Sequence, residues 1–335
     1  MKAIRREPTD VTPVWFMRQA GRALPRYRES RAMRDMFSIL REPEAAAEIT
    51  AMPLDYFPVD AAVLYNDLVT PFIPAGLDLE MKPGIGPVVN DPIETAADID
   101  RLKPFDPRVG LKYIMDQIEL LVKRIDVPVL GFVGAPFTLC SYLIRGSRSK
   151  QQEEIKTFMY QEPEAWNRLA SFWAEHLGEF GVAQHEAGAS AVQVFDSWAG
   201  SLSPEDYETY VLPHSQRLIS KMRDAGVPVI HFATGNPALL PLVAQAGGDC
   251  ISVDWRLPID TAWDIIGEDK AIQGNLDPVA LFAPWEAVQP RVDTVLQQAC
   301  GRPGHIFNLG HGILPHTPVD TVKRLVDYVH TASAR

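Results

Sequence analysis

The sequence is poor in cysteine: its 335 residues include only three, at positions 140, 250 and 300. No two of them form a CxxC pair, and three thiols cannot build a disulfide framework, so the reducing cytoplasm is the expected compartment. The sequence also lacks any run approaching 18 apolar residues, and no apolar stretch follows the charged start MKAIRREPTD. We therefore expect neither a membrane span nor a secretory signal.

Motifs that would indicate a nucleotide cofactor are also missing. There is no GxxxxGK[ST] sequence and no GxGxxG after the first apolar run. No internal repeat or Pro/Gly/Ser-rich linker divides the chain, and its hydrophobic (46%) and charged (22%) fractions are those of an ordinary globular protein. Because α/β barrels often exceed about 250 residues, we expect residues 1–335 to form one domain.

Positive charge is scarce overall but concentrated near the start. The formal net charge is −11, which excludes generic nucleic-acid binding because phosphate backbones require a broad basic surface. Residues 1–41 nevertheless hold ten Lys/Arg, nine of them arginine, against four Asp/Glu, which leaves −17 for the remainder. Such a segment is either a solvated tail or a site reserved for a small anionic ligand, and composition does not decide between the two.

Eight short apolar runs alternate with longer helical patterns. The runs are Val14–Met17, Ala61–Tyr65, Val129–Val133, Ala191–Phe195, Val229–Phe232, Ile251–Asp254, Ala271–Gly274 and Ile306–Leu309. They are β-branched or aromatic and bounded by Pro, Gly or Asp, as is typical of strands buried on both faces. Eight strands alternating with helices predict an α/β fold, a (β/α)8 TIM-type barrel, whose active site lies at the C-terminal ends of the strands.

The intervening helices have apolar stripes and start signals. Leu111–Ile125 carries apolar residues at i, i+3, i+4 and i+7, with charged residues off that stripe. Ser203, Asn236 and Thr317 each precede a proline and are predicted to open helices.

Two arginines follow the first predicted strand. Arg18 and Arg22 are four residues apart in RQAGR, and on a helical turn their guanidinium groups would share one face. A guanidinium fork binds a carboxylate with two hydrogen bonds, so two forks suit a ligand with several carboxylates or phosphates. The alternative is a surface turn with ordinary exposed arginines.

Other polar residues also stand at predicted strand ends. Asp67, after the second run, is either a cap or a reactive acid, and Tyr142 is either a core residue or a ligand contact. Ser197 lacks a GxSxG frame, so it is a ligand hydrogen bond or an N-cap rather than a nucleophile. His311 lies between two glycines that give its backbone freedom, in a loop position that often binds anions in barrels. His231 has no second metal ligand beside it, so no zinc site is expected.

These segments together resemble the uroporphyrinogen decarboxylase family over nearly the whole chain. The resemblance is carried by RQAGR at 18–22, YND at 65–67, GFVGAPFTL at 131–139 with Tyr142, FDSWAG at 195–200 and NLGHG at 308–312. The first and last of these motifs are the most specific, and they occur in the family's order.

The resemblance implies a (β/α)8 barrel, usually a homodimer, that uses no cofactor or metal. It implies that the enzyme removes the carboxyl groups of the four acetate side chains of uroporphyrinogen III, giving coproporphyrinogen III and CO2 in haem and tetrapyrrole biosynthesis. The implied catalytic residues are Asp67, Arg18 and His311. The implied substrate-binding residues are Arg18, Gln19, Ala20, Gly21, Arg22, Asp67, Tyr142, Ser197 and His311, with Phe132 and Phe195 as walls.

The expected chemistry uses the substrate's own pyrrole as the electron sink, where other enzymes supply a cofactor. Asp67 would stabilise the cationic ring from beneath the macrocycle, and nearby arginines would keep it ionised. The proton donor is open: Arg18 or a water it orders is one hypothesis, and His311 is the more usual donor by pKa.

Two alternatives remain. Related zinc methyltransferases use a His-x-Cys pair and a further cysteine, where this sequence has His231-Phe232-Ala233 and His311. A catalytically silent tetrapyrrole carrier is the other, although a carrier of a polyanion has little use for a buried acid such as Asp67.

Overall fold

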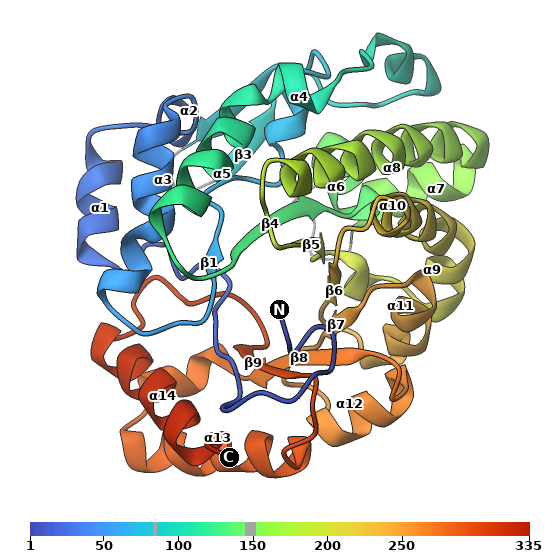
Figure 1. The fold of residues 1–335 in the computed structure, drawn as a ribbon. Helices are drawn as coiled ribbons and strands as arrows, with labels where there is room; N and C mark the ends of the chain where they lie inside the picture. Colours follow the sequence, from blue (N-terminus) through green and yellow to red (C-terminus); the bar gives the residue numbers. More distant parts are fainter. Residues whose placement is uncertain (83–85, 145–151) are drawn as a thin grey trace.

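The computed structural model describes residues 1–82, 86–144 and 152–335, and its centre is a ring of parallel strands (Figure 1). In this part of the chain, seven strands form one sheet in the order β1-β4-β5-β6-β7-β8-β9. Their bounds are β1 (Ala62–Val63), β4 (Val129–Gly134), β5 (Ala191–Asp196), β6 (Val229–Ala233), β7 (Cys250–Ser252), β8 (Ala271–Leu276) and β9 (His305–Leu309). All neighbouring pairs are parallel. The predicted barrel of alternating strands and helices is confirmed.

The first predicted strand, Val14–Met17, is wrong as a regular strand, although it lies where the ring closes. Val14 forms a single parallel bridge to Phe307 of β9, and on its other side its carbonyl accepts from Asp60 N at 2.8 Å. Beyond Val14, on the side toward β1, a side chain replaces main-chain pairing. Gln19 Oε1 accepts from Phe16 N (3.0 Å), and Gln19 Nε2 donates to Ala61 O (2.8 Å).

A two-stranded antiparallel sheet, absent from the predicted elements, follows β1. Its strands are β2 (Leu79–Lys82) and β3 (Gly86–Val89). No residue of this pair is buried, so the pair has no buried apolar run of the kind that identified the barrel strands.

Helices surround the ring (Figure 1). The α-helices are α1 (Pro25–Ala32), α2 (Met36–Leu40), α3 (Pro43–Ala51), α4 (Pro107–Gly110), α5 (Lys112–Arg124), α6 (Pro136–Leu143), α7 (Glu153–Gln161), α8 (Pro163–Glu186), α9 (Pro204–Tyr210), α10 (Leu212–Asp224), α11 (Leu240–Ala246), α12 (Ile259–Ile266), α13 (Trp285–Ala299) and α14 (Val319–Ala332). Short 3-10 helices are η1 (Met52–Asp55), η2 (Thr70–Phe72), η3 (Ala96–Arg101), η4 (Ala199–Ser201), η5 (Pro237–Leu239) and η6 (Pro278–Phe282). No described helix is long and apolar enough to cross a membrane.

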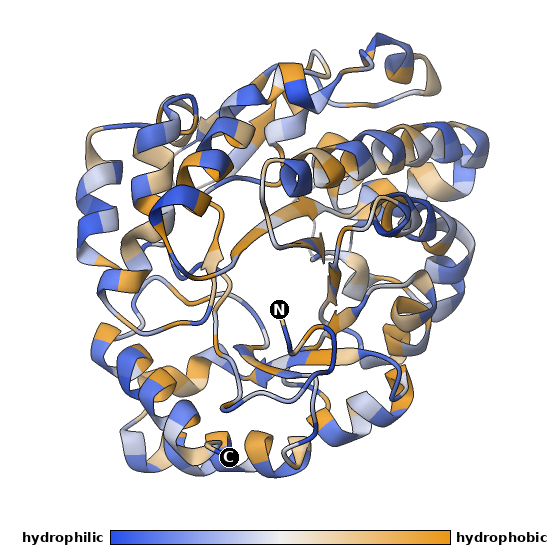
Figure 2. Ribbon diagram, in the orientation of Figure 1, coloured by the Kyte–Doolittle hydropathy of each residue, from blue (hydrophilic) through white to orange (hydrophobic). Residues whose placement is uncertain are grey.

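The helix signals were mostly reliable. Helix α5 buries Ile114, Ile118 and Leu121 of its predicted stripe, and along the helices apolar and polar residues alternate (Figure 2). Ser203 Oγ caps α9 by accepting from Asp206 N at 3.1 Å. The predicted cap at Thr317 is wrong, because α14 begins at Val319 with Pro318 as its N-cap residue and no side-chain cap.

The barrel interior holds an apolar cluster and a polar layer. Strand alternation turns Ile230 and Phe232 of β6 inward, together with small residues such as Ala191 and Ala271. Gln273 Nε2 donates to Gln193 Oε1 (3.1 Å) and to Ser252 Oγ (2.9 Å) in the same interior. The interior is therefore filled by side chains, and a ligand site must lie at one end of the barrel.

Candidate active site

A cavity of about 1050 Å³ opens at the carboxyl-terminal ends of the strands. This is at the upper end of the range of about 300–1,000 Å³ that small-molecule sites occupy, so it has room for a large ligand. Every residue singled out from the sequence as binding or catalytic lines it: Arg18, Gln19, Ala20, Gly21, Arg22, Asp67, Phe132, Tyr142, Phe195, Ser197 and His311. The sequence pattern therefore located the cavity, although lining alone assigns no role.

The RQAGR turn is held in an unusual backbone conformation. Arg18 has φ +60°, in the left-handed region that residues with a Cβ seldom adopt. Gly21 lies so close to this residue that an added Cβ would stand 2.5 Å from the Arg18 carbonyl oxygen. Such strain persists where the surrounding structure enforces it, and it is common at functional sites.

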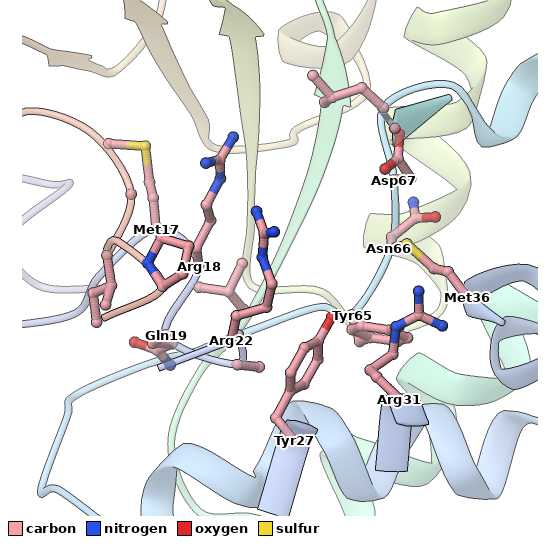
Figure 3. A pocket seen from close by; sticks show the side chains of 18 of the residues that line it. Met17, Arg18, Gln19, Arg22, Tyr27, Arg31, Met36, Tyr65, Asn66 and Asp67 are labelled. Carbon is pink, nitrogen blue, oxygen red and sulfur yellow. The ribbon is translucent and has the colours of Figure 1, made fainter. Parts of the chain in front are cut away.

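The two guanidinium groups in this turn point the same way into the cavity (Figure 3). Within the described residues neither Arg18 nor Arg22 has a side-chain hydrogen bond or an ion pair, and both side chains are exposed. The predicted shared face is thus present, on a turn rather than a helix. Two unpaired positive charges at the wall of a cavity are ready to bind an anionic ligand.

Two other members of the turn do different work. The side-chain amide of Gln19 is almost completely buried and is used up in the two hydrogen bonds that tie the turn to the barrel. Ala20 has no functional group beyond its backbone. Both line the cavity, but what they can offer a ligand is limited to their main chain.

Asp67 faces the arginines from the other side of the cavity (Figure 3). Its Oδ1 accepts a hydrogen bond from Val69 N at 3.1 Å, which closes a turn before η2; Asp67 is not the cap of that helix, whose N-cap residue is Val69 and which has no side-chain cap. Burial raises the pKa of Asp67, while the Val69 amide and Arg18 oppose that change. The expectation that arginines keep this acid ionised is right in sign for Arg18, but desolvation is the larger effect, so the net pKa shift is upward.

His311 is a neutral side chain at ordinary pH. Burial, and next the charge of Arg18, lower its pKa to about 4. Its Nδ1 accepts a hydrogen bond from Gly312 N at 2.7 Å, which leaves the proton of the neutral ring on Nε2. These facts argue against a protonated His311 as a source of protons.

The glycine after His311 is needed for space rather than for backbone freedom. Gly312 does not have a positive φ, but an added Cβ would lie 2.6 Å from Arg18 Cδ. The backbone of the next residue is fixed too, because Ile313 N donates to Met17 O at 2.9 Å. The NLGHG and RQAGR motifs, from opposite ends of the chain, therefore form one structural unit.

Comparison with known proteins agrees with this geometry. The family model described as uroporphyrinogen decarboxylase (URO-D) matches residues 1–332. A uroporphyrinogen decarboxylase from Salinispora tropica is 49% identical over 336 residues, covering 100% of this chain and 90% of that protein. One from Sorangium cellulosum is 49% identical over 333 residues, covering 99% and 95%.

The chain belongs to the uroporphyrinogen decarboxylase family. As a member of that family it is a carboxy-lyase that decarboxylates uroporphyrinogen III in tetrapyrrole biosynthesis.

Solved structures show how widely this fold is used. A methyltransferase from Methanosarcina mazei superposes with a TM-score of 0.79 at 19% identity, covering 98% of this chain and 96% of that one. A B12-independent methionine synthase from Shewanella gives 0.57 at 12% identity. At such identities the likeness shows the fold alone.

The ligand positions that a zinc methyltransferase would need are not assembled in this uroporphyrinogen decarboxylase family member. His231 is completely buried, and its ring lies near the backbone of Val243 and Gly247 rather than in the cavity. No three His, Cys, Asp or Glu side chains gather as a metal site anywhere in the described chain.

The apolar wall of the cavity includes the ring of Phe232, which was not singled out from the sequence. Phe132 and Phe195 meet edge to face with centroids 5.5 Å apart, and Phe195 meets Phe232 in the same way at 5.7 Å. Phe232 then approaches His311 at 6.1 Å. Strand alternation could have identified Phe232 as a cavity residue, because His231 and Phe232 must face opposite sides of β6.

Several further lining residues were missed because they come from elements outside the barrel strands. They are Tyr27, Arg31 and Lys82, with Ile313 and Pro315 after β9. Met17 and Tyr65 also line the cavity, although they were expected only as the ends of predicted strands. Arg26, on the same helix α1 as Arg31, does not line the cavity and instead pairs with Asp55 at 2.6 Å. The basic segment is thus divided between ligand-facing and internally paired arginines.

Proposed function

We propose that the cavity binds uroporphyrinogen III with Arg18 and Arg22 on its carboxylates and Asp67 beneath the macrocycle. All four acetate carboxyl groups would leave as CO2, giving coproporphyrinogen III. The observation that carries this assignment is the pair of unpaired guanidinium groups facing the Asp67 carboxyl across one cavity. The substrate is an anion at its edge and a set of N–H donors at its centre, and this arrangement is complementary to both.

The chemistry needs no electron sink beyond the substrate. A proton added to a pyrrole ring carbon creates an iminium-like cation. The bond between the acetate CH2 and its carboxylate then breaks, CO2 leaves, and the bonding electrons neutralise the ring. The exocyclic methylene takes up a proton to become a methyl group, and the ring loses the one it gained. The net reaction at each site consumes one proton and releases one CO2.

Asp67 would supply the stabilisation of the cationic ring. An ionised carboxylate in a water-poor cavity interacts more strongly with developing positive charge than it would in water. Burial raises the pKa of Asp67, so its ionised form is costly and is favoured by the cation formed in the transition state. That difference between ground state and transition state is what accelerates a reaction.

Proton delivery is assigned to Arg18 or to a water that it orders, rather than to His311. The pKa of His311 is lowered to about 4, first by burial, so few of these rings carry an extra proton at neutral pH. The neutral ring can instead donate its Nε2 hydrogen to a substrate carboxylate. His311 would then be a binding residue that also touches the reacting molecule.

The remaining cavity wall would sort the carboxylates of the substrate. Phe132, Phe195 and Phe232 offer no hydrogen bond, and a carboxylate held against them is destabilised relative to its neutral product. Tyr142 and Ser197 would contact the periphery of the macrocycle from the neighbouring wall. No hydrogen bond from the Ser197 hydroxyl is formed within the described chain, so it is available to a ligand.

Three properties of the whole protein belong to the same proposal. Residues 1–335 would act as one barrel domain, two copies would form a homodimer, and the enzyme would work in the cytoplasm. The family resemblance supports the first two. Three unpaired cysteines, two of them buried, are consistent with the third.

The test is anaerobic incubation with uroporphyrinogen III followed by oxidation and chromatography of the porphyrins. We expect successive loss of four carboxyl groups, ending at coproporphyrin, with no reaction when the protein is omitted. Binding of the substrate without any loss of CO2 would instead indicate a carrier and overturn the proposal.

A further inference from the structure

An acidic side chain lies directly behind the cavity wall, where the reaction described above does not use it. Asp196 is the last residue of β5, next to Phe195, whose ring faces the cavity. Because side chains alternate along a strand, Asp196 points the other way, toward the surrounding helices. It is 0% exposed.

One oxygen of Asp196 connects two cavity-lining segments. Thr138 Oγ1, on helix α6, donates to Asp196 Oδ1 at 3.0 Å. The same hydroxyl accepts a longer hydrogen bond from Trp198 N at 3.4 Å. A hydroxyl has one hydrogen, so the acceptor at Asp196 makes Thr138 present a lone pair to the Trp198 amide.

These contacts connect Asp196 with two residues that line the cavity, Tyr142 and Ser197. Thr138 and Tyr142 lie one turn apart on α6, so fixing the first fixes the helix that carries the second. The Trp198 amide belongs to the residue after Ser197, and the Trp198 ring meets the Tyr142 ring edge to face with centroids 6.3 Å apart. A second link joins the same segments, since Ala135 N donates to Phe195 O at 2.8 Å.

The other oxygen of Asp196 is not used structurally. Within the described residues Asp196 Oδ2 has no hydrogen-bond partner, and neither have Tyr207 Oη on α9 and Ser215 Oγ on α10. Leaving a buried carboxyl oxygen unsatisfied costs stability, so a role in packing alone does not account for an acid here. Burial also raises the pKa of Asp196 to about 7. The charge of Asp196 in turn adds to the effect of burial in raising the pKa of Tyr207.

We propose that Asp196 is a positioning residue for the decarboxylation, setting Tyr142 and Ser197 against the substrate through the hydroxyl of Thr138. This inference rests on the proposed contacts of Tyr142 and Ser197 with the periphery of the macrocycle. Asp196 itself does not line the cavity and touches no reacting atom.

The test compares two variants of one helix. Thr138→Val removes the hydroxyl that accepts a hydrogen bond from Trp198 N and donates one to Asp196 Oδ1. Ser141→Ala removes a hydroxyl equally buried on α6, but one that bonds only Phe137 O of its own helix at 2.8 Å. We expect T138V to raise KM for uroporphyrinogen III by roughly 3- to 10-fold, which is the effect of losing about one hydrogen bond between the protein and the substrate. We expect S141A to leave KM unchanged. T138S, which keeps the hydroxyl, should restore KM.

A second measurement examines the acid directly. Asp196→Asn keeps an acceptor for Thr138 but cannot lose a proton. The wild-type profile of kcat/KM against pH should show a step near neutrality that D196N lacks. A lower melting temperature in T138V and D196N, with KM and the pH profile both unchanged, would show that the contact is only structural and overturn the inference.

The double variant Tyr142→Phe, Ser197→Ala separates this inference from the function beneath it. If it raises KM while T138V does not and D196N keeps the wild-type pH profile, the peripheral contacts stand and the role of Asp196 is wrong. If it leaves KM unchanged, the peripheral contacts themselves are wrong, and the positioning role fails with them.

Discussion

The two ends of the barrel both carry basic side chains around a hollow, and they use them differently. At the amino-terminal end a hollow of about 880 Å³ is lined by the basic side chains of Arg5, Arg6, Arg223 and Lys270. Three of them have a carboxylate partner: Arg5 pairs with Glu7 at 2.7 Å, Arg223 with Asp249 at 3.4 Å and Lys270 with Asp269 at 3.0 Å. Arg6 instead donates to the backbone carbonyl of Glu268 at 2.8 Å.

At the carboxyl-terminal end Arg34 and Lys82 are paired with Glu42 and Glu80, but two arginines beside the strand ends are left without carboxylate partners. Arg18 and Arg22 make no ion pair with any described residue, and Asp67, which faces them across the cavity, has a pKa raised by burial. Exposed ion pairs add little stability, so the paired end loses little if they are broken. The unpaired charges of Arg18 and Arg22 beside the cavity contribute no ion pair to the stability of the fold. The free guanidinium groups of Arg18 and Arg22, rather than basic composition, distinguish the carboxyl-terminal end as the binding end.

The largest difference between the two ends should appear on removing one negative charge from each. Asp67→Asn should lower kcat by about 100- to 1,000-fold, the usual cost of deleting one group that stabilises transition-state charge. Asp269→Asn, at the opposite end and highly exposed, should leave kcat unchanged. Steady-state kinetics with circular dichroism as the fold control would measure this. Near-normal turnover in D67N would remove Asp67 from the mechanism.

Much of this comparison could be predicted from the sequence, because the ends of parallel strands gather at one end of a barrel. That rule placed Arg18, Asp67 and His311 in one cavity before any distance was known. It could not show that Gly312 makes room for the stem of Arg18, since that contact joins opposite ends of the chain. Nor could it show that Gln19 substitutes for strand pairing, because a side chain in the role of a backbone leaves no periodic pattern.

The direction in which a side chain points from its strand was harder to predict. Phe232 was overlooked because its neighbour His231 suggested metal chemistry, and only the direction of each side chain separates the two. Asp196 escaped notice for a similar reason. An acid at a strand end looks the same in sequence whether it faces the cavity, as Asp67 does, or the helix layer.

Removing one positive charge from each end gives the next largest contrast. Arg22→Ala should raise KM by roughly 10- to 100-fold, because a hydrogen bond to a charged group contributes about 1.5–3 kcal/mol. Arg223→Ala deletes an arginine that is already paired with Asp249 and should leave KM within experimental error. An unchanged KM in R22A would count against its role as an anchor for substrate carboxylates.

Two histidines should give the ends opposite responses to pH. His311, in the cavity, has a pKa lowered to about 4 by burial, so the wild-type protein loses stability as pH falls from about 6.5 toward 4. His330, at the other end, has a pKa raised by Asp60, whose Oδ2 lies 2.7 Å from its Nε2. Its contribution is fully present below pH 6.5 and is lost as pH rises through the raised pKa.

Urea unfolding at several pH values would measure both effects. His311→Gln should stabilise the protein relative to wild type by about 1–2 kcal/mol at pH 5 and not at pH 8. His330→Gln should destabilise it at pH 6, by less than about 1 kcal/mol for a partly exposed pair, and have no effect at high pH. The same sign of response in both variants would mean that the two environments do not differ as described.

The smallest effect concerns two arginines on one helix. Arg31 lines the cavity, whereas Arg26 is held by Asp55 and, at 3.7 Å, by Glu48. Both substitutions to Gln remove one positive charge from α1, so the net charge of the protein changes equally. If unpaired charge at the cavity mouth draws in the polyanionic substrate, R31Q should lower kcat/KM by roughly 2- to 5-fold at low ionic strength, and the loss should fade as salt screens the attraction. R26Q should show neither effect, because its charge is already neutralised locally. Equal salt dependence in the two variants would mean that the association rate of the substrate depends on the net charge of the protein alone. The absence of ion pairs would then distinguish the binding site but would not affect how fast the macrocycle reaches it.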